Sequence, residues 1–217
     1  MRNVKILAAA GLMTMAGIAQ ADVTGTAAIV SDYDFRGITQ TNEDPAVQLS
    51  IDYAGAGGWY VGTWGSNIDW LPEASTEVDV YTGFKGTAGS LGYDVGIVYY
   101  AYPDDSEVNT YEVYGKLSVG WLTGSVYYTD DYYNTDEDEI YVAADAAIPA
   151  GPLSINLHAG FTDSEAFAGG DYTDYAAGIS YTASNITLGM KWVTTEIDNT
   201  SDDRVILSIS TALPWMQ

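Results

Sequence analysis

The strongest constraint on the fold is a repeated alternation of apolar and polar residues. In VQLSIDY (47–53), every second residue is apolar, beginning with Val47. Successive side chains of a β-strand point to opposite faces, so such a segment has one apolar and one polar face. The sequence predicts twelve such strands, and no segment shows a convincing helical period. These strands are 23–35, 46–53, 59–70, 77–86, 91–102, 110–119, 121–129, 139–148, 153–162, 172–182, 186–196 and 203–213.

The connections between these segments alternate in kind. After even-numbered strands they are short, neutral and rich in residues that favour tight hairpins. These short turns are AGAGG (54–58), TAGS (87–90), VGW (119–121), PAGP (149–152) and ASN (183–185). After odd-numbered strands they are longer and acidic, at 43–45, 72–76, 103–109, 130–139, 163–171 and 196–203. All but six of the 30 Asp and Glu residues lie in the long links or at the adjoining strand ends. We therefore expect one strongly negative end and one nearly uncharged end.

Alternation alone leaves two environments open for the apolar face, because a soluble sandwich or a lipocalin-like barrel would also bury it. Runs of about ten residues match tilted strands that cross a bilayer. The even strand number places both ends of the barrel domain on the short-turn side. Together these features favour an all-β fold, a transmembrane antiparallel up-and-down β-barrel of about twelve strands.

Aromatic residues near both ends of the apolar faces support the membrane interpretation, because such barrels carry two aromatic girdles. Those expected near the long links are Trp70, Tyr99, Tyr111, Tyr128, Phe161, Tyr175 and Trp192. Those expected near the short turns are Tyr53, Tyr60, Phe84, Tyr93 and Tyr181. We expect the apolar face to contact lipid and the polar face to line the interior.

The N-terminus has the layout of a secretory signal peptide. Arg2 and Lys5 precede an apolar run that ends at the small residues Ala19 and Ala21. We predict a cleaved signal peptide at 1–21 and a barrel domain at 22–217, located in the outer membrane of a Gram-negative bacterium. Without the signal, the chain has five basic and 30 acidic residues, and this negative charge excludes nucleic acid as a partner. The chain has no cysteine, so it forms neither disulfides nor thiolate metal sites.

The segment SDYDFRGITQTNEDPAVQLSIDY (31–53), followed by WGSNIDW (64–70), resembles the TorF-like family of proteobacterial outer-membrane porins. The matching positions are Ser31, Asp32, Tyr33, Phe35, Arg36, Gly37, Gln40, Thr41, Pro45, Ala46, Gln48, Asp52, Tyr53, Trp64, Ser66 and Asn67. The resemblance implies an outer-membrane β-barrel with channel activity and no catalytic residues. Outer-membrane barrels generally end on an aromatic residue, whereas here Trp215 is followed by Met216 and Gln217.

Charged residues on the polar strand faces are the candidates for lining a pore. They are Arg36, Asp52, Asp79, Lys85, Asp94, Glu112, Lys116, Asp145, Lys191 and Arg204. Arg36 is expected to point inward beside Asp32 and Asp34. It has two interpretations: a charged constriction that selects ions, or a structural ion pair that fixes the first long loop. A twelve-stranded bore with inward tyrosines predicts a narrow pore at most.

The predicted function is a porin-like channel for passive diffusion of small solutes or ions that prefers cations, since a negative mouth concentrates them. The alternative is a non-conducting structural or adhesin-type surface barrel. We expect no cofactor and no enzyme. Ser154, Asn156 and His158 share a face, but residues two apart on a strand lie too far apart for a catalytic relay. Expected partners are outer-membrane lipid, lipopolysaccharide, the barrel-assembly machinery and weakly bound divalent cations at the acidic loops.

Overall fold

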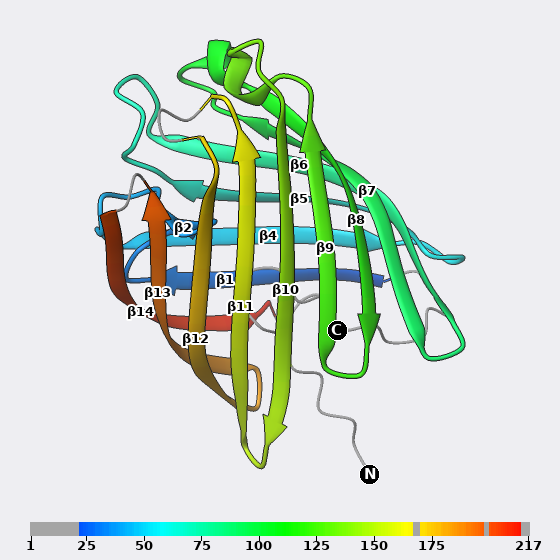
Figure 1. Cartoon of the computed structure of the whole chain (residues 1–217). Helices are drawn as coiled ribbons and strands as arrows, with labels where there is room; N and C mark the ends of the chain where they lie inside the picture. The colour runs from blue at the N-terminus through cyan, green and yellow to red at the C-terminus, as the bar shows by residue number, and fades with distance from the viewer. Residues whose placement is uncertain (1–21, 167–169, 198–199, 214–217) are drawn as a thin grey trace.

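The chain forms a closed antiparallel barrel of twelve strands in a computed structural model that describes residues 22–166, 170–197 and 200–213 (Figure 1). The barrel strands are β1 (Asp22–Val30), β4 (Ala46–Ala54), β5 (Trp59–Asn67), β6 (Thr76–Ala88), β7 (Leu91–Ala101), β8 (Thr110–Val119), β9 (Leu122–Thr129), β10 (Glu139–Ala150), β11 (Leu153–Ser164), β12 (Tyr172–Ala183), β13 (Ile186–Ile197) and β14 (Thr200–Ala212). Sequential strands pair around the ring, and β1 closes it by pairing with both β4 and β14. This confirms the predicted fold class. The predicted signal peptide lies outside the described residues.

The outer surface of the barrel is apolar. Val47, Leu49 and Ile51 of β4 are 56, 54 and 49% exposed, although each belongs to a regular strand. Apolar side chains are exposed in the same alternating way on the other barrel strands. A continuous apolar surface of this extent is suited to hydrocarbon rather than water. None of the helices among the described residues is long and apolar enough to cross a membrane.

The aromatic girdles are present, with two corrections. Exposed aromatics of the predicted set are Tyr99, Tyr111, Tyr128, Phe161, Tyr175 and Trp192 near the loops, and Phe84 and Tyr181 near the turns. Tyr60 was predicted to face outward, but it points inward and is 2% exposed, because its neighbour Trp59 takes the outward position. Trp70 was also assigned to the girdle. β5 ends at Asn67, so Trp70 lies in a loop and packs against Tyr102.

The first predicted strand, 23–35, is too long. β1 ends at Val30, and the following segment forms a small hairpin from β2 (Asp34–Phe35) and β3 (Ile38–Thr39). Arg36 and Gly37 turn the hairpin with φ angles of 50° and 80°. Periodicity could not show this turn, because the residues on either side of it continue to alternate. We call residues 31–45, which connect β1 to β4, the inward loop.

The alternation of short turns and longer loops is confirmed at all but one connection. Two-residue turns join β6 to β7, β8 to β9, β10 to β11 and β12 to β13. The loops include two short 3-10 turns, η1 (Ser106–Val108) and η2 (Tyr132–Asn134). The predicted long link at 196–203 is wrong, because β13 and β14 extend into it and Glu196 pairs with Ser201. Cross-strand hydrogen bonding there outweighs the local acidity.

Candidate functional site

The inward loop is attached to one wall of the barrel by ion pairs. Arg204 on β14 contacts the carboxylate of Asp32 and donates to that of Asp34 at 2.9 Å. The same guanidinium donates to the carbonyl oxygen of Gly37 at the hairpin turn. Lys191 on β13 adds a second contact to Asp34, at 2.9 Å. Both basic residues were predicted to line the lumen, and the structure places them as anchors of this loop.

Arg36 attaches the tip of the same loop to the opposite wall. Its guanidinium lies 2.8 Å from the carboxylate of Glu112 on β8 and pairs with Glu139 on β10. Around the ring, β8 lies six strands from β14 in either direction. The loop therefore crosses the interior of the barrel. These contacts correspond to the second interpretation of Arg36, a structural ion pair that fixes the first long loop.

The environment of Arg36 keeps it charged. Its guanidinium lies 4.6 Å from the ring centroid of Phe35 and 4.3 Å from that of Tyr141, positions that favour cation–π attraction. Burial alone would lower the pKa of Arg36, but the carboxylates of Glu112 and Glu139 outweigh this and raise that pKa. The residue therefore acts as a permanent cation inside the barrel.

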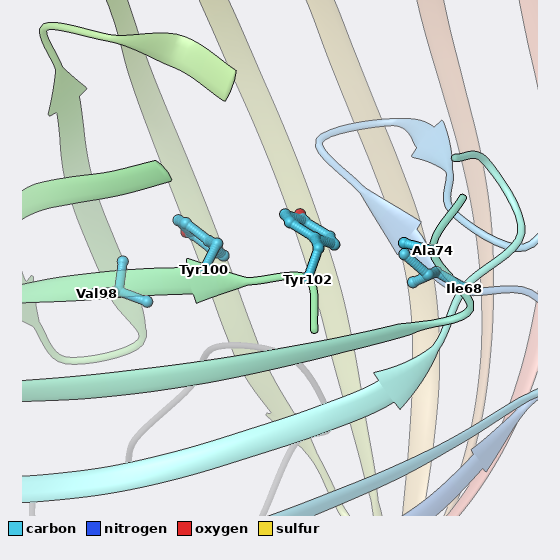
Figure 2. Close-up of a cluster of buried hydrophobic side chains, with 5 residues drawn as sticks. All are labelled: Ile68, Ala74, Val98, Tyr100 and Tyr102. Atoms are coloured by element: carbon cyan, nitrogen blue, oxygen red, sulfur yellow. The ribbon is translucent and has the colours of Figure 1, made fainter. Parts of the chain in front are cut away.

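An aromatic cap covers part of the interior beside the inward loop. Its buried members include Ile68 and Ala74 between β5 and β6, and Tyr102 after β7. Figure 2 shows Tyr100 and Tyr102 projecting from the end of β7 into the barrel, with Ile68 and Ala74 together near the inward loop. Partly buried side chains pack against this cluster, including Tyr33, Phe35, Trp70, Leu71 and Tyr133. The loop between β5 and β6 and the segment after β7 thus fold over the barrel beside the inward loop.

Two neighbouring acids of β6 lie beneath this cap. Glu77 accepts hydrogen bonds from the hydroxyls of Tyr33 at 2.9 Å and Tyr102 at 3.3 Å. Burial raises the pKa of both Tyr33 and Tyr102, so these phenols remain protonated donors. Asp79 is 9% exposed, and its Oδ1 atom has no hydrogen-bond partner among the described residues.

The turn-side half of the interior has a different character, with charged groups set among tyrosines. Lys85 lies over the ring of Tyr60 at 5.0 Å. The hydroxyl of Tyr60 donates to Asp94 at 2.5 Å and also contacts the hydroxyl of Tyr114. In register along the sheet, Asp94 pairs with Lys85 on one side and with Lys116 on the other.

Lys116 and Asp52 complete this turn-side region. The Lys116 ammonium lies 5.1 Å from the ring centroid of Tyr114 and 5.4 Å from that of Tyr127. Asp52 accepts a hydrogen bond from the hydroxyl of Tyr81. In the turn-side half of the interior, lysines therefore lie over aromatic rings and aspartates accept hydrogen bonds from phenols, in contrast to the ion pairs of the inward loop.

His158 on β11 bridges two carboxylates of the neighbouring strands. Its Nδ1 lies 2.7 Å from Asp145 and its Nε2 lies 2.8 Å from Asp174, with the hydroxyl of Tyr141 at 2.9 Å. Ser154 instead donates to the side chain of Asn156 at 3.2 Å. Two carboxylates at the two ring nitrogens favour an imidazolium that is held in place rather than a general base.

All ten charged residues predicted to line a pore lie on the inner side of the barrel or in the inward loop. Asp32 and Asp34, expected beside Arg36, are buried or paired inside as well. Sequence analysis missed three further acids that join them, Glu77, Glu139 and Asp174, because it assigned these residues to the outer rim. For Glu77, Glu139 and Asp174 the parity of the adjoining strand was the available signal. In the part of the chain that the structure describes, no group of three or more acidic, histidine or cysteine residues is arranged to hold a metal ion.

Comparisons with known proteins agree with this architecture. A family model described as a bacterial protein of unknown function, Gcw_chp, matches residues 15–211. The solved structure of the KdgM porin is similar, with a TM-score of 0.57 and 10% identity over 88% of this chain and 98% of that chain. The NanC porin gives 0.56 and 12% identity over 88% of this chain and 100% of that one. At such identities the likeness shows a shared fold. Among curated proteins, none matches the sequence significantly.

Proposed function

The chain belongs to the Gcw_chp family of bacterial proteins of unknown function, and we propose that it is an outer-membrane channel for passive diffusion of small solutes or ions, with a preference for cations. A closed barrel with an apolar exterior and a polar, charged interior supports a channel. The shared fold with the KdgM and NanC porins is consistent with this proposal.

The observation that carries the cation preference is the excess of acids inside the barrel. The interior carboxylates are Asp32, Asp34, Asp52, Glu77, Asp79, Asp94, Glu112, Glu139, Asp145 and Asp174. The interior bases are Arg36, Lys85, Lys116, Lys191, Arg204 and His158. A low-dielectric wall focuses this negative potential into the lumen, which favours cations and repels anions.

The same excess of interior acids argues against assigning to this chain the ligand of a structural neighbour. One KdgM porin structure is a complex with disordered oligogalacturonate. A galacturonate oligomer is a polyanion, and an interior with more carboxylates than bases would repel it. We therefore do not extend that ligand to this chain.

Reversal potentials of the refolded protein across a KCl gradient in planar bilayers test the proposal. A cation-selective channel gives a reversal potential displaced toward the potassium equilibrium value. A shift toward the chloride value would overturn the cation preference. The inward loop that crosses the lumen favours a second candidate, a non-conducting structural or adhesin-type barrel. Correctly folded protein that inserts without conducting would establish that alternative.

We further propose that the N-terminal signal directs export and that the barrel-assembly machinery inserts the protein among outer-membrane lipid and lipopolysaccharide. Acidic loop residues would bind divalent cations weakly, since carboxylates suit hard ions. The resemblance to TorF-like porins supports this location, and we assign the chain no catalytic role. Fractionation of expressing cells tests the location: the mature protein is expected in the outer-membrane fraction, without residues 1–21.

A further inference from the structure

Four inward tyrosines lie along the barrel wall, and Tyr81 shows how. Tyr81 on β6 donates a hydrogen bond to Asp52 on β4, so its ring passes across β5, the strand between them. Gly62 is the residue of β5 that pairs with both Tyr81 and Asp52. A Cβ atom at Gly62 would lie 2.6 Å from Cζ of Tyr81, well inside the contact distance of about 3.5–4.0 Å between carbon atoms. The ring can therefore rest on this strand only because the residue beneath it is glycine.

Two further tyrosines cross the wall in the opposite direction around the barrel. Tyr60 on β5 donates to Asp94 on β7 at 2.5 Å, and its ring crosses β6 at Gly83, its partner in register. A Cβ atom at Gly83 would lie 2.7 Å from Cζ of Tyr60. Tyr114 on β8 pairs with Gly96 on β7 and contacts the hydroxyl of Tyr60. A Cβ atom at Gly96 would lie 2.6 Å from the Tyr114 hydroxyl.

The fourth tyrosine repeats the arrangement in another part of the wall. Tyr141 on β10 donates to Asp174 on β12 at 3.3 Å, and a Cβ atom at Gly160 on the intervening β11 would lie 2.8 Å from its Cε2 atom. Each of the four rings thus crosses the neighbouring strand over a glycine, and each hydroxyl contacts a polar group of a strand beyond it. We call Gly62, Gly83, Gly96 and Gly160 the socket glycines.

We infer that the socket glycines determine the width of the channel, because they seat four tyrosine rings against the wall and out of the lumen. Sequence analysis expected inward tyrosines to narrow the bore, but a ring that lies along the wall fills less of it. A side chain at a socket glycine would displace the ring, and the strand behind the ring leaves it only the direction of the barrel axis. The inference deepens the proposed function and rests on it, since it names residues that set the size of the solutes that pass.

Gly62→Ala tests the inference directly, because the three atoms nearest to the added methyl group belong to the side chains of Tyr81 and Asp52 and none to the backbone. Planar bilayers give the single-channel conductance of the refolded protein and the largest neutral polyethylene glycol that enters the pore. Gly62→Ala is expected to lower the conductance several-fold and to reduce that size limit. Adding Tyr81→Ala to Gly62→Ala is expected to restore both at least to wild-type values, because no ring is left to displace.

Gly189→Ala is the matched control. Gly189 lies on the inner face of β13, but a Cβ atom there would meet only the side chain of Ser208, whose hydroxyl can rotate away. This variant is expected to keep the wild-type conductance and size limit. Gly160→Ala replaces Gly62→Ala if the latter does not fold, since its methyl group would also meet side chains alone, those of Tyr141 and Asp174.

The outcomes separate this inference from the proposed channel. Wild-type conductance and size limit in folded Gly62→Ala overturn it, as does a loss that persists without Tyr81 or that Gly189→Ala reproduces. Melting temperatures in a neutral detergent add a measurement that does not depend on conduction. Tyr81→Ala is expected to lower the melting temperature less in the Gly62→Ala background than in the wild type, and equal losses would show that the ring is not seated on Gly62. A barrel that meets this expectation without conducting retains the seated rings and rejects the channel.

Discussion

The loop-side and turn-side halves of the barrel interior carry similar residue types but hold them in different ways. On the loop side, Glu112, Glu139 and Arg204 are 5% exposed or less and are engaged by the inward loop. On the turn side, Lys85 and Lys116 are only partly buried and lie over tyrosine rings. The strands alternate in the same way throughout their length, so they do not cause this difference.

The difference teaches that one connecting segment, the inward loop, determines how charged residues are held on the loop side of the interior. Residues 31–45 bring two acids and one base into the lumen and match each to an opposite charge on the wall. Ion pairs in a low-dielectric interior are tolerated only when both partners are present and well placed. The loop-side wall is therefore built to receive the loop, whereas the turn-side wall is complete without it.

Removing the inward loop should have the largest effect. Replacing residues 32–44 with a short Gly-Ser linker is expected to raise single-channel conductance several-fold, because the segment that crosses the lumen is lost. A difference in gel mobility between the unheated and the heated protein confirms that the barrel has formed. Unchanged conductance in a folded variant would show that ions bypass the loop and that it is no constriction.

Breaking one attachment of the inward loop should destabilise the protein without fully opening the lumen. Arg36→Met leaves Glu112 and Glu139 buried without a counter-ion, which is expected to cost about 3–5 kcal/mol of unfolding free energy. The matched control is Lys191→Met, because Lys191 is 37% exposed on its side chain and Asp34 keeps Arg204 as a partner. That loss is expected to stay within about 1 kcal/mol.

Urea titration of both variants in lipid vesicles measures the comparison. Equal losses for Arg36→Met and Lys191→Met would contradict the view that the buried ion pairs of Arg36 contribute more to stability than the exposed one of Lys191. Arg36→Lys serves as a further check, since a lysine keeps the charge but loses the two-pronged contact with Glu112 and Glu139.

How well the sequence predicts a structural feature depends on how far apart in the chain the interacting residues lie. The strand faces follow from local alternation, so the outward Leu49 and the inward Asp52 were assigned correctly. Tyr60 was misassigned because two adjacent aromatics, Trp59 and Tyr60, compete for the outward position. Strand parity is therefore reliable only where apolar and polar residues alternate unambiguously.

The candidate site depended on contacts that periodicity does not encode. Arg36 and Glu139 are 103 positions apart in the chain, and Arg204 and Asp32 are 172 apart. The sequence showed that Arg36 was unusual among acids, but it did not show that the chain reverses at Gly37. Likewise, the acids of the long links and adjoining strand ends were interpreted as a solvated rim, whereas the fold places three of them, Glu77, Glu139 and Asp174, inside the barrel.

The smallest expected effect concerns the turn-side half. Lys116→Gln removes one positive charge and its contacts with the rings of Tyr114 and Tyr127. The expected loss of stability is about 0.5–1 kcal/mol, the usual range for a cation–π contact that is not fully desolvated. Because the mutation makes the interior more negative, reversal potentials should shift slightly further toward the potassium value, whereas Lys116→Arg should leave them unchanged. A loss as large as that of Arg36→Met would mean that the turn-side wall also depends on buried charge pairing, and the contrast between the two halves would fail.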